Sequence, residues 1–179
     1  MNLKDYIAVV EGFPKEGISF KDVSPLLADK DAFKYTVKEL AKAAKKYEPD
    51  VIIGPESRGF LFGTPVAYEL NKGFVMARKE GKLPGKVLQI KFDIEYGQEV
   101  LCIPYDAIKK GMRVLIVDDL IATGGTIEAL AKMCRDIGAI PVGALAVIEL
   151  TDIVNNEEKT IPYESLIKYL SLIHISEPT

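Results

Sequence analysis

The sequence is poor in the residues that build metal centres, disulfide frameworks and histidine-dependent active sites. It contains no tryptophan, one histidine and two cysteines among 179 residues, and aromatic residues make up only 8%. Cys102 and Cys134 provide neither a disulfide framework nor a metal-binding spacing, so we expect both to pack in the core of a protein from a reducing compartment. The single histidine, His174, lies near the carboxyl end. A histidine-containing catalytic triad and a histidine-based metal site are therefore excluded.

The sequence also lacks an excess of positive charge, a long apolar run and a signal peptide. Lys and Arg total 23 against 26 Asp and Glu, which gives a net charge of -3, whereas proteins that bind nucleic acid usually carry a basic excess. No run approaches the length of a membrane span, and residues 1–5 do not combine charged and apolar residues as a secretory leader does. We therefore expect a cytoplasmic protein with neither a nucleic acid nor a membrane as its partner.

Hydrophobic residues make up 48% of the chain, enough for one proper core. Residues 31–47 place apolar side chains at helical spacing, with lysines on the opposite side. Short apolar runs predict buried strands, and the helices between them complete right-handed crossovers. The pattern predicts an α/β protein with a central, mostly parallel sheet flanked by helices. The predicted strands are 51–53, 74–76, 114–117 and 142–148, and residues 87–103 read as two strands around the turn Glu95, Tyr96 and Gly97.

The most informative segment runs from Val114 to Thr126, with the sequence VLIVDDLIATGGT. An apolar strand leads to two adjacent acids and then to a glycine-rich turn before a helix that we expect to end at Gly138. Ligands of open α/β sheets bind beyond the carboxyl ends of the strands, and glycine-rich turns at helix N-termini bind anions. The turn is therefore predicted to bind a phosphate group. Its residues are Ala122, Thr123, Gly124, Gly125 and Thr126.

Asp118 and Asp119 would repel that phosphate, so we expect them to face sugar hydroxyls or a Mg²⁺ ion that arrives with the substrate. A P-loop does not fit, because its G-x-x-x-x-G-K-S/T pattern is absent and the acids precede the turn. The segment predicts a ribose-phosphate site. Taken alone, it leaves a synthase, a transferase and a sensor of sugar phosphates open.

The segment from Val114 to Thr126 resembles the phosphoribosyl pyrophosphate motif of the type I phosphoribosyltransferases, and its form DDLIATGGT is similar to that of the adenine-specific members. Four further segments resemble those members in the same order, and the similarity runs from about residue 6 to residue 169. The resemblance implies the type I phosphoribosyltransferase fold, in one domain over residues 1–169. It also implies a small N-terminal hood at about residues 6–28 and a flexible lid at about residues 87–103. The four segments are Phe13–Asp22, Glu56–Phe60, Arg78–Gly85 and Glu95–Gly97.

The resemblance further assigns a pyrophosphate-binding role to two loops, one with a single arginine and one with a cluster of three cations. The guanidinium of Arg58 suits a pair of pyrophosphate oxygens, because its N–H groups form a planar fork. Without the resemblance, the basic cluster after residue 77 would be taken for an ordinary solvated surface. In related enzymes some of these cations come from the neighbouring subunit, which implies a homodimer. The pyrophosphate-binding residues are Ser57, Arg58, Arg78, Lys79 and Lys82.

The resemblance implies that the hood binds the base and that the lid assists its proton transfer. Phe20 offers a flat face for a purine, while backbone groups around Ser19 and Lys21 would read its edge. Both flanking residues differ from the aliphatic residue and the arginine that the family commonly shows. Glu95, in the lid, would manage the proton on the purine ring as the ring nitrogen bonds to carbon. These assignments give Ser19, Phe20 and Lys21 as adenine-binding residues and Glu95 as the catalytic residue.

The activity implied by the resemblance is transfer of the phosphoribosyl group from phosphoribosyl pyrophosphate (PRPP) to adenine, with Mg²⁺ as cofactor. The products would be AMP and pyrophosphate. Transfer to another base, such as xanthine, hypoxanthine or orotate, is the first alternative, which the hood disfavours. A DNA-binding regulator that senses PRPP is the second, and the low positive charge and the absence of an extra N-terminal module disfavour it.

Residues 170–179 follow the end of the similarity with the sequence LSLIHISEPT. This sequence looks like the translation of a transposase sequencing adapter. We therefore expect residues 170–179 to be a non-native tail.

Overall fold

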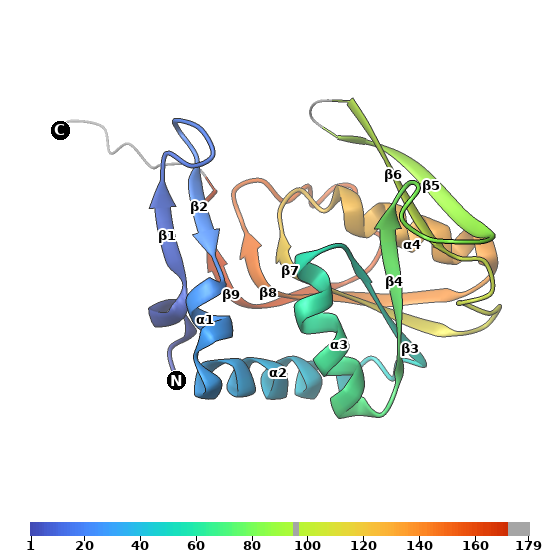
Figure 1. Ribbon diagram of the computed structural model, residues 1–179, viewed down its shortest axis with the longest axis horizontal. Coiled ribbons are helices and arrows are strands. Elements are labelled where there is room, and N and C mark those ends of the chain that lie inside the picture. Colours follow the sequence, from blue (N-terminus) through green and yellow to red (C-terminus); the bar gives the residue numbers. More distant parts are fainter. Residues whose placement is uncertain (95–96, 172–179) are drawn as a thin grey trace.

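A computed structural model describes residues 1–94 and 97–171 of the chain. They form a seven-stranded sheet with helices on both faces and a separate two-stranded sheet (Figure 1). This arrangement confirms the predicted α/β class. In chain order the elements are η1 (Leu3–Tyr6), β1 (Ala8–Glu11), β2 (Ser19–Asp22), α1 (Ser24–Ala28), α2 (Lys30–Lys45), β3 (Val51–Pro55), α3 (Arg58–Leu70), β4 (Gly73–Lys79), β5 (Val87–Ile94), β6 (Gly97–Pro104), β7 (Arg113–Ile121), α4 (Gly125–Ile137), β8 (Ile140–Leu150) and β9 (Tyr163–Tyr169).

The large sheet has the strand order β5-β6-β4-β3-β7-β8-β9. The pairs β3–β4, β3–β7, β7–β8 and β8–β9 are parallel, while β6 runs antiparallel to both β4 and β5. All four predicted parallel strands are present, and the predicted pair of strands over residues 87–103 is the β5–β6 hairpin. Glu95 and Tyr96 lie outside the described residues. Strand β9 was not predicted, because its residues are neither continuously apolar nor strictly alternating.

Strand β7 is longer than predicted. The expected end after Val117 is wrong, because β8 continues to pair alongside and carries β7 on to Ile121, with Leu120 opposite Ile148. On the other side, the last partner that β3 offers to β7 is Ile53, opposite Ile116. The two acids therefore lie within a strand that has lost one of its two neighbours.

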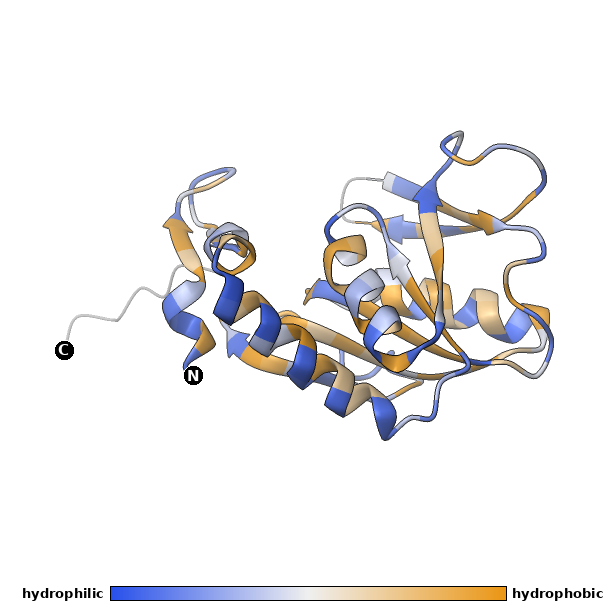
Figure 2. Ribbon diagram, turned by 60° about the horizontal axis from the view of Figure 1, so that its bottom comes forward, coloured by the Kyte–Doolittle hydropathy of each residue, from blue (hydrophilic) through white to orange (hydrophobic). Residues whose placement is uncertain are grey.

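Helices α2 and α3 cover one face of the sheet, and α4 covers the other. Helix α2 begins at Asp29, whose carboxylate accepts hydrogen bonds from the amides of Asp31 (3.0 Å) and Ala32 (2.9 Å), as a helix N-cap does. Its polar and apolar residues fall on different sides in Figure 2, which confirms the predicted amphipathic helix. Helix α4 ends at Gly138, as predicted, with a φ of 90°. Within the described ranges, no helix is long and apolar enough to cross a membrane.

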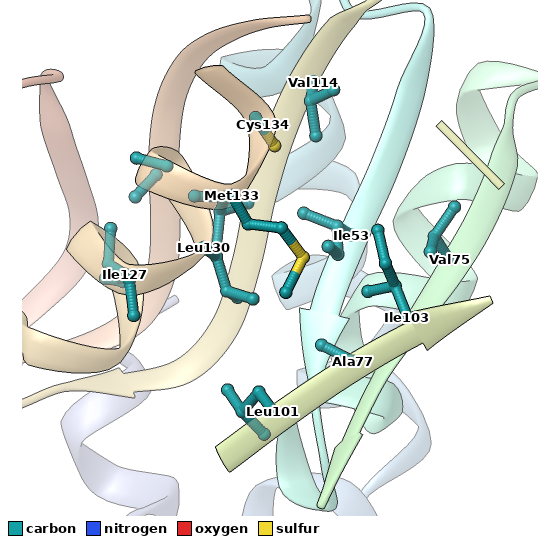
Figure 3. Packing of buried hydrophobic residues seen from close by; sticks show 14 of the residues in the cluster. Ile53, Val75, Ala77, Leu101, Ile103, Val114, Ile127, Leu130, Met133 and Cys134 are labelled. Carbon is teal, nitrogen blue, oxygen red and sulfur yellow. The ribbon is translucent and has the colours of Figure 1, made fainter. Parts of the chain in front are cut away.

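The core on the α4 side is formed by residues from the helix, from the parallel strands and from the antiparallel β5–β6 hairpin. Leu130 and Met133 of α4 lie over Ile53 of β3, and Leu101 of the β5–β6 hairpin lies beside them (Figure 3). Leu130 and Ile53 are fully buried. Burial of these side chains fixes the helix, and with it the turn at its N-terminus, against the sheet.

The core on the opposite side contains a close approach between α3 and the sheet that requires glycine. A Cβ atom on Gly63 of α3 would lie 2.5 Å from the ring of Phe74, and one on Gly54 of β3 would lie 3.0 Å from the same ring. Such distances are shorter than packed side chains tolerate. The two glycines allow helix α3 to pack closely on the sheet through the Phe74 ring.

The predicted hood contains the β1–β2 hairpin and the short helix α1, at the opposite end of the large sheet from the β5–β6 hairpin (Figure 1). The end of the described chain joins it, because the amide of Ser19 donates to the carbonyl of Ser171 (2.9 Å). Asp152 accepts hydrogen bonds from both the amide and the hydroxyl of Ser171. The non-native origin of residues 170–179 stays a prediction, and residues 172–179 lie outside the described residues.

Truncation of Leu130 to alanine tests the core on the α4 side. Leu130→Ala removes a fully buried side chain and should lower the free energy of unfolding by about 2–5 kcal/mol. Urea unfolding followed by circular dichroism measures this loss. Lys132→Ala, which truncates an exposed side chain on the same helix, should cost about 1 kcal/mol or less. Equal losses in the two variants would contradict this account of the core.

Candidate active site

The carboxyl ends of β3 and β7 open into a cavity of about 420 Å³. Its wall combines the loop after β3 with a continuous stretch of chain that comprises the second half of β7 and the start of α4. Strands β4 and β6 close another side. The lining residues are Pro55, Glu56, Ser57, Arg58, Lys79, Glu99, Leu101, Asp118, Asp119, Leu120, Ala122 and Thr126.

The two acids on β7 interact directly. The Asp119 amide donates to the Asp118 carboxylate at 2.8 Å. Burial raises the pKa of Asp118 well above its ordinary value, and the neighbouring Asp119 carboxylate raises it further because like charges repel. Gly59 lies against the same group, since a Cβ atom there would approach the Asp118 Oδ1 to 3.0 Å. The start of α3 thus packs directly on the acidic pair.

Arg58 is the partner of the second acid. Its Nε lies 2.8 Å from the Asp119 Oδ2, and the side chain of Asp119 is only 9% exposed while that of Arg58 is 55% exposed. The guanidinium also lies 6.0 Å from the centre of the Phe20 ring. Arg58 therefore spans the gap between the acids of the large sheet and the β1–β2 hairpin.

The start of α4 carries amide groups with no partner in the described part of the chain. Gly124 precedes the helix with a φ of 96° and offers no side-chain cap. The Gly125 amide donates to the Thr123 hydroxyl (3.3 Å), but no described acceptor receives the amides of Thr126 and Ile127. Unpaired amides and the positive end of the helix dipole favour an anion at this position.

The predicted cations differ in their proximity to the cavity. Lys79 lines it, whereas Arg78 and Lys82 do not. Glu56 positions this group, because its Oε1 accepts a hydrogen bond from the Lys79 amide (2.7 Å) and another from the Arg78 Nε (3.2 Å). The pKa of Glu56 is lowered by the hydrogen bond from Lys79 and by the charge of Arg78. Lys82 is connected to this group through its carbonyl, which lies 3.5 Å from Arg78 Nη1.

The hood residues lie on β2, outside the lining of the cavity. Phe20 is half-buried and meets Phe13 edge to face, with 5.1 Å between the ring centres. Lys21 is buried, and its ammonium group donates to the Ser19 carbonyl (3.0 Å) and the Ser19 hydroxyl. Burial lowers the pKa of Lys21. The Lys21 side chain is therefore directed to its own strand.

Two acids in the cavity wall, Glu56 and Glu99, were not predicted as site residues from the sequence. Glu56 adjoins the predicted Ser57 and Arg58, and its place inside that motif was an available signal. Glu99 lies on β6, and its carboxylate is 3.9 Å from the Lys79 ammonium group. No sequence signal marks Glu99, because its role depends on the pairing of β6 with β4.

The chemistry of the cavity suits a metal ion that is shared with a substrate. No group of three or more His, Cys, Asp or Glu residues within residues 1–94 and 97–171 has the geometry of a metal site. Asp118 and Asp119 supply carboxylate oxygens. One or two protein carboxylates together with substrate phosphates are the usual ligands of Mg²⁺.

Comparisons with known proteins agree with this geometry. Residues 27–174 match the phosphoribosyl transferase domain family. An adenine phosphoribosyltransferase of Clostridium acetobutylicum is 52% identical over 171 residues, which cover 94% of this chain and 99% of the relative. A crystal structure of the enzyme of that name from Thermoanaerobacter pseudethanolicus is 46% identical, with a TM-score of 0.89 over 93% of this chain and 98% of the other. That from Saccharomyces cerevisiae, complexed with an imino-altritol bisphosphate and adenine, is 36% identical, with a TM-score of 0.85 over 92% and 96%.

Because the pKa of Asp118 is raised, we predict that its ionisation lowers the free energy of unfolding of the ligand-free protein. As the pH rises from 3.8, the ordinary value for Asp, the unfolded chain releases this proton before the folded chain does. The contribution of Asp118 to stability therefore falls with rising pH, until the pH passes its raised pKa. Asp118→Asn removes this cost and keeps an oxygen that accepts from the Asp119 amide, so its stability relative to the wild type should increase from pH 4 towards neutrality. Urea unfolding across this range measures the difference.

Asp136→Asn is the matched control, because Asp136 is an exposed carboxylate paired with Lys132 on α4. Its stability relative to the wild type should show no such increase. If the difference in free energy of unfolding between Asp118→Asn and the wild type did not change with pH, the proposed destabilisation by the ionised Asp118 would be contradicted.

Proposed function

Because the chain belongs to the adenine phosphoribosyltransferase family, we propose that it transfers the phosphoribosyl group of PRPP to adenine and so forms AMP and pyrophosphate in purine salvage. The observation that carries this proposal is the single cavity that joins two acids, a guanidinium and the N-terminus of α4. These groups complement, in that order, the hydroxyls, the pyrophosphate and the 5′-phosphate of PRPP.

The 5′-phosphate binds at the turn before α4. There the unpaired amides of Thr126 and Ile127 donate to it, and the hydroxyls of Thr123 and Thr126 add further donors. The phosphate-binding residues are Ala122, Thr123, Gly124, Gly125 and Thr126.

The ribose hydroxyls donate hydrogen bonds to Asp118 and Asp119. In the ligand-free chain Asp119 is bound to Arg58. The pyrophosphate of PRPP competes for that guanidinium, because a phosphate oxygen pair matches its fork as well as a carboxylate does. Substrate binding therefore exchanges the Arg58–Asp119 ion pair for Arg58–pyrophosphate and Asp119–hydroxyl contacts.

The remaining cations complete the pyrophosphate site, which consists of Ser57, Arg58, Arg78, Lys79 and Lys82. Their charges stabilise the departing group as its bond to the anomeric carbon lengthens and positive charge grows on the sugar. A Mg²⁺ ion that arrives with PRPP would neutralise further charge, and Asp118 and Asp119, which line the cavity, are the residues that would hold it. Catalysis thus rests mainly on positioning and electrostatics.

Adenine stacks on Phe20, and backbone groups around Ser19 and Lys21 contact its edge. The position of Arg58 near both Phe20 and Asp119 supports this placement, because it sets the base beside the sugar. Glu95, which follows β5 in the sequence, accepts the proton that the purine nitrogen loses. Closure of the hairpin over the cavity excludes water from the activated sugar.

The protein acts as a homodimer in the cytoplasm. Leu61 and Tyr68, seven residues apart on α3, are 44% and 85% exposed, and Met76 on β4 is 41% exposed. An apolar surface on the two elements that carry Arg58 and Lys79 fits a second copy of the chain, with the interface continuous with the active site. The buried free thiols of Cys102 and Cys134 suit a reducing compartment.

Incubation of the protein with PRPP, Mg²⁺ and one base at a time tests the proposed activity. Adenine should yield AMP and equimolar pyrophosphate, and removal of Mg²⁺ with a chelator should abolish the product. Product from hypoxanthine, xanthine or orotate alone would overturn the assignment. Specific DNA binding without any turnover would favour a regulator.

The double variant Asp118→Asn with Asp119→Asn tests the role of the acids within this assay. The variant keeps hydrogen-bonding side chains and should fold, but turnover should fall by orders of magnitude, on the order of the 10²–10³-fold loss typical of a removed electrostatic contact. Wild-type rates in this variant would refute the role of the acidic pair.

Tyr68→Glu tests the proposed interface. A charge on this exposed apolar surface should convert the dimer to a monomer in sedimentation or light-scattering measurements, because an unpaired carboxylate is costly to bury. Lys42→Glu alters an exposed residue of α2 and should leave the mass unchanged. A monomeric wild type, or a Tyr68→Glu dimer of undiminished affinity, would rule out this interface.

A further inference from the structure

The turn before α4 is held from behind by the connection between β8 and β9. The Asn155 amide donates to the Thr123 carbonyl at 2.9 Å. The peptide bond between Thr123 and Gly124 is trans, so its carbonyl and its N–H point in opposite directions. By holding the carbonyl, Asn155 fixes the Gly124 N–H on the side that faces away from this connection.

Tyr163, the first residue of β9, makes a second contact with the same turn. Its ring lies so close to Gly124 that a Cβ atom there would be 2.8 Å from the phenol oxygen and 3.1 Å from Cε2. Gly124 is therefore required both by its positive φ of 96° and by the tyrosine packed on it. Any shift of the Tyr163 ring changes the space in which the turn is formed.

The Tyr163 hydroxyl is itself fixed by Glu128 in the first turn of α4. It donates to the Glu128 Oε2 at 2.5 Å, and the Glu128 amide donates to the Gly124 carbonyl at 2.9 Å. Burial raises the pKa of Tyr163, and the Glu128 carboxylate raises it further, so the phenol remains a donor at physiological pH. Gly124, Glu128 and Tyr163 thus form a closed set of contacts.

The other oxygen of Glu128 is occupied as well. Its Oε1 accepts from the Thr160 amide (3.2 Å) and from the Thr160 hydroxyl, to which Arg135 donates in turn. These donors keep the carboxylate on the side of the β8–β9 connection. If Glu128 were free to turn, its negative charge would compete with a phosphate for the unpaired amides of the helix N-terminus.

We propose that Tyr163 and Glu128 are positioning residues that hold the 122–126 turn in its phosphate-binding conformation. This inference rests on the proposed function, because it assigns the turn to the 5′-phosphate of PRPP. The two residues act through the turn and touch no substrate. Their loss should weaken ligands that carry a 5′-phosphate and leave the recognition of the base unchanged.

Tyr163→Phe tests the proposal, because it keeps the ring over Gly124 and removes only the hydroxyl donor. The KM for PRPP and the dissociation constant for ribose 5-phosphate, measured by calorimetry, should both rise about three- to tenfold, the range expected for part of a hydrogen bond to a charged group. The KM for adenine and the kcat at saturating PRPP should stay within about twofold. Glu128→Gln retains an oxygen for the phenol and should weaken phosphate ligands less than Glu128→Ala does.

Tyr47→Phe is the matched control. The Tyr47 hydroxyl also donates to a glutamate, Glu164 at 3.1 Å, and its ring also packs on a glycine, Gly143, but this pair lies away from the turn. Both tyrosine variants should lose similar thermal stability, yet only Tyr163→Phe should lose affinity for ribose 5-phosphate.

Equal affinity for ribose 5-phosphate in the wild type and in Tyr163→Phe would overturn the inference. If the wild type nevertheless forms AMP, the proposed activity stands. A parallel loss of affinity for adenine would also overturn it, since a general structural defect would then explain both. If the wild type forms no AMP but Tyr163→Phe still weakens ribose 5-phosphate, the proposed activity fails and the positioning role stands.

Discussion

The unequal pairing of β7 with its two neighbours is the constraint on which the site depends. β3 offers its last partner at Ile116, while β8 continues beside β7 to Ile121. The strand therefore remains rigid on one side and becomes accessible on the other at the same residues. Asp118 and Asp119 occupy this half-paired stretch, so the sheet fixes their backbone while their side chains can meet Arg58 and the cavity. A loop could offer the same side chains, but with less fixed positions.

Opposite charges from different loops neutralise one another in the ligand-free chain. Asp119 is paired with Arg58, and Glu56 holds the amide of Lys79 and the side chain of Arg78. The pairing of Asp119 and the pairing of Glu56 differ in how easily a ligand can break them. Arg58 is largely exposed and can be released by an anion, whereas Glu56 is joined to a backbone amide and fixes the course of the cation-bearing loop. The site therefore combines an exchangeable ion pair with a permanent one.

The structural features that depend on residues close together in the sequence were predictable, whereas those that depend on contacts between distant segments were not. The strands, the amphipathic helix over residues 31–47 and the end of α4 at Gly138 follow from periodicity and from glycine at a left-handed position. The end of β7 was predicted too early, because apolar character stops at Val117 whereas pairing with β8 does not. The contact of Tyr163 with Gly124 joins segments 39 residues apart (163 minus 124), and no local pattern at either position indicates it. The proposed roles of the 122–126 turn and of the two acids come from the local pattern, those of the cations, the hood residues and Glu95 come from the family resemblance, and the geometry supplies the relative positions of the described residues.

The single ring of Phe74 beneath Gly54 and Gly63 has a consequence for how this sequence can change over time. Gly54 is also confined by the backbone carbonyl of Val117 at 2.9 Å, whereas Gly63 is confined by the Phe74 ring, so a larger residue at position 63 is tolerated only after the aromatic ring at position 74 has become smaller. A smaller residue at position 74 in turn leaves a void between α3 and the sheet. Positions 63 and 74 are therefore expected to covary among homologues, whereas position 54 should remain glycine, and the order in which substitutions are acquired decides whether each intermediate folds.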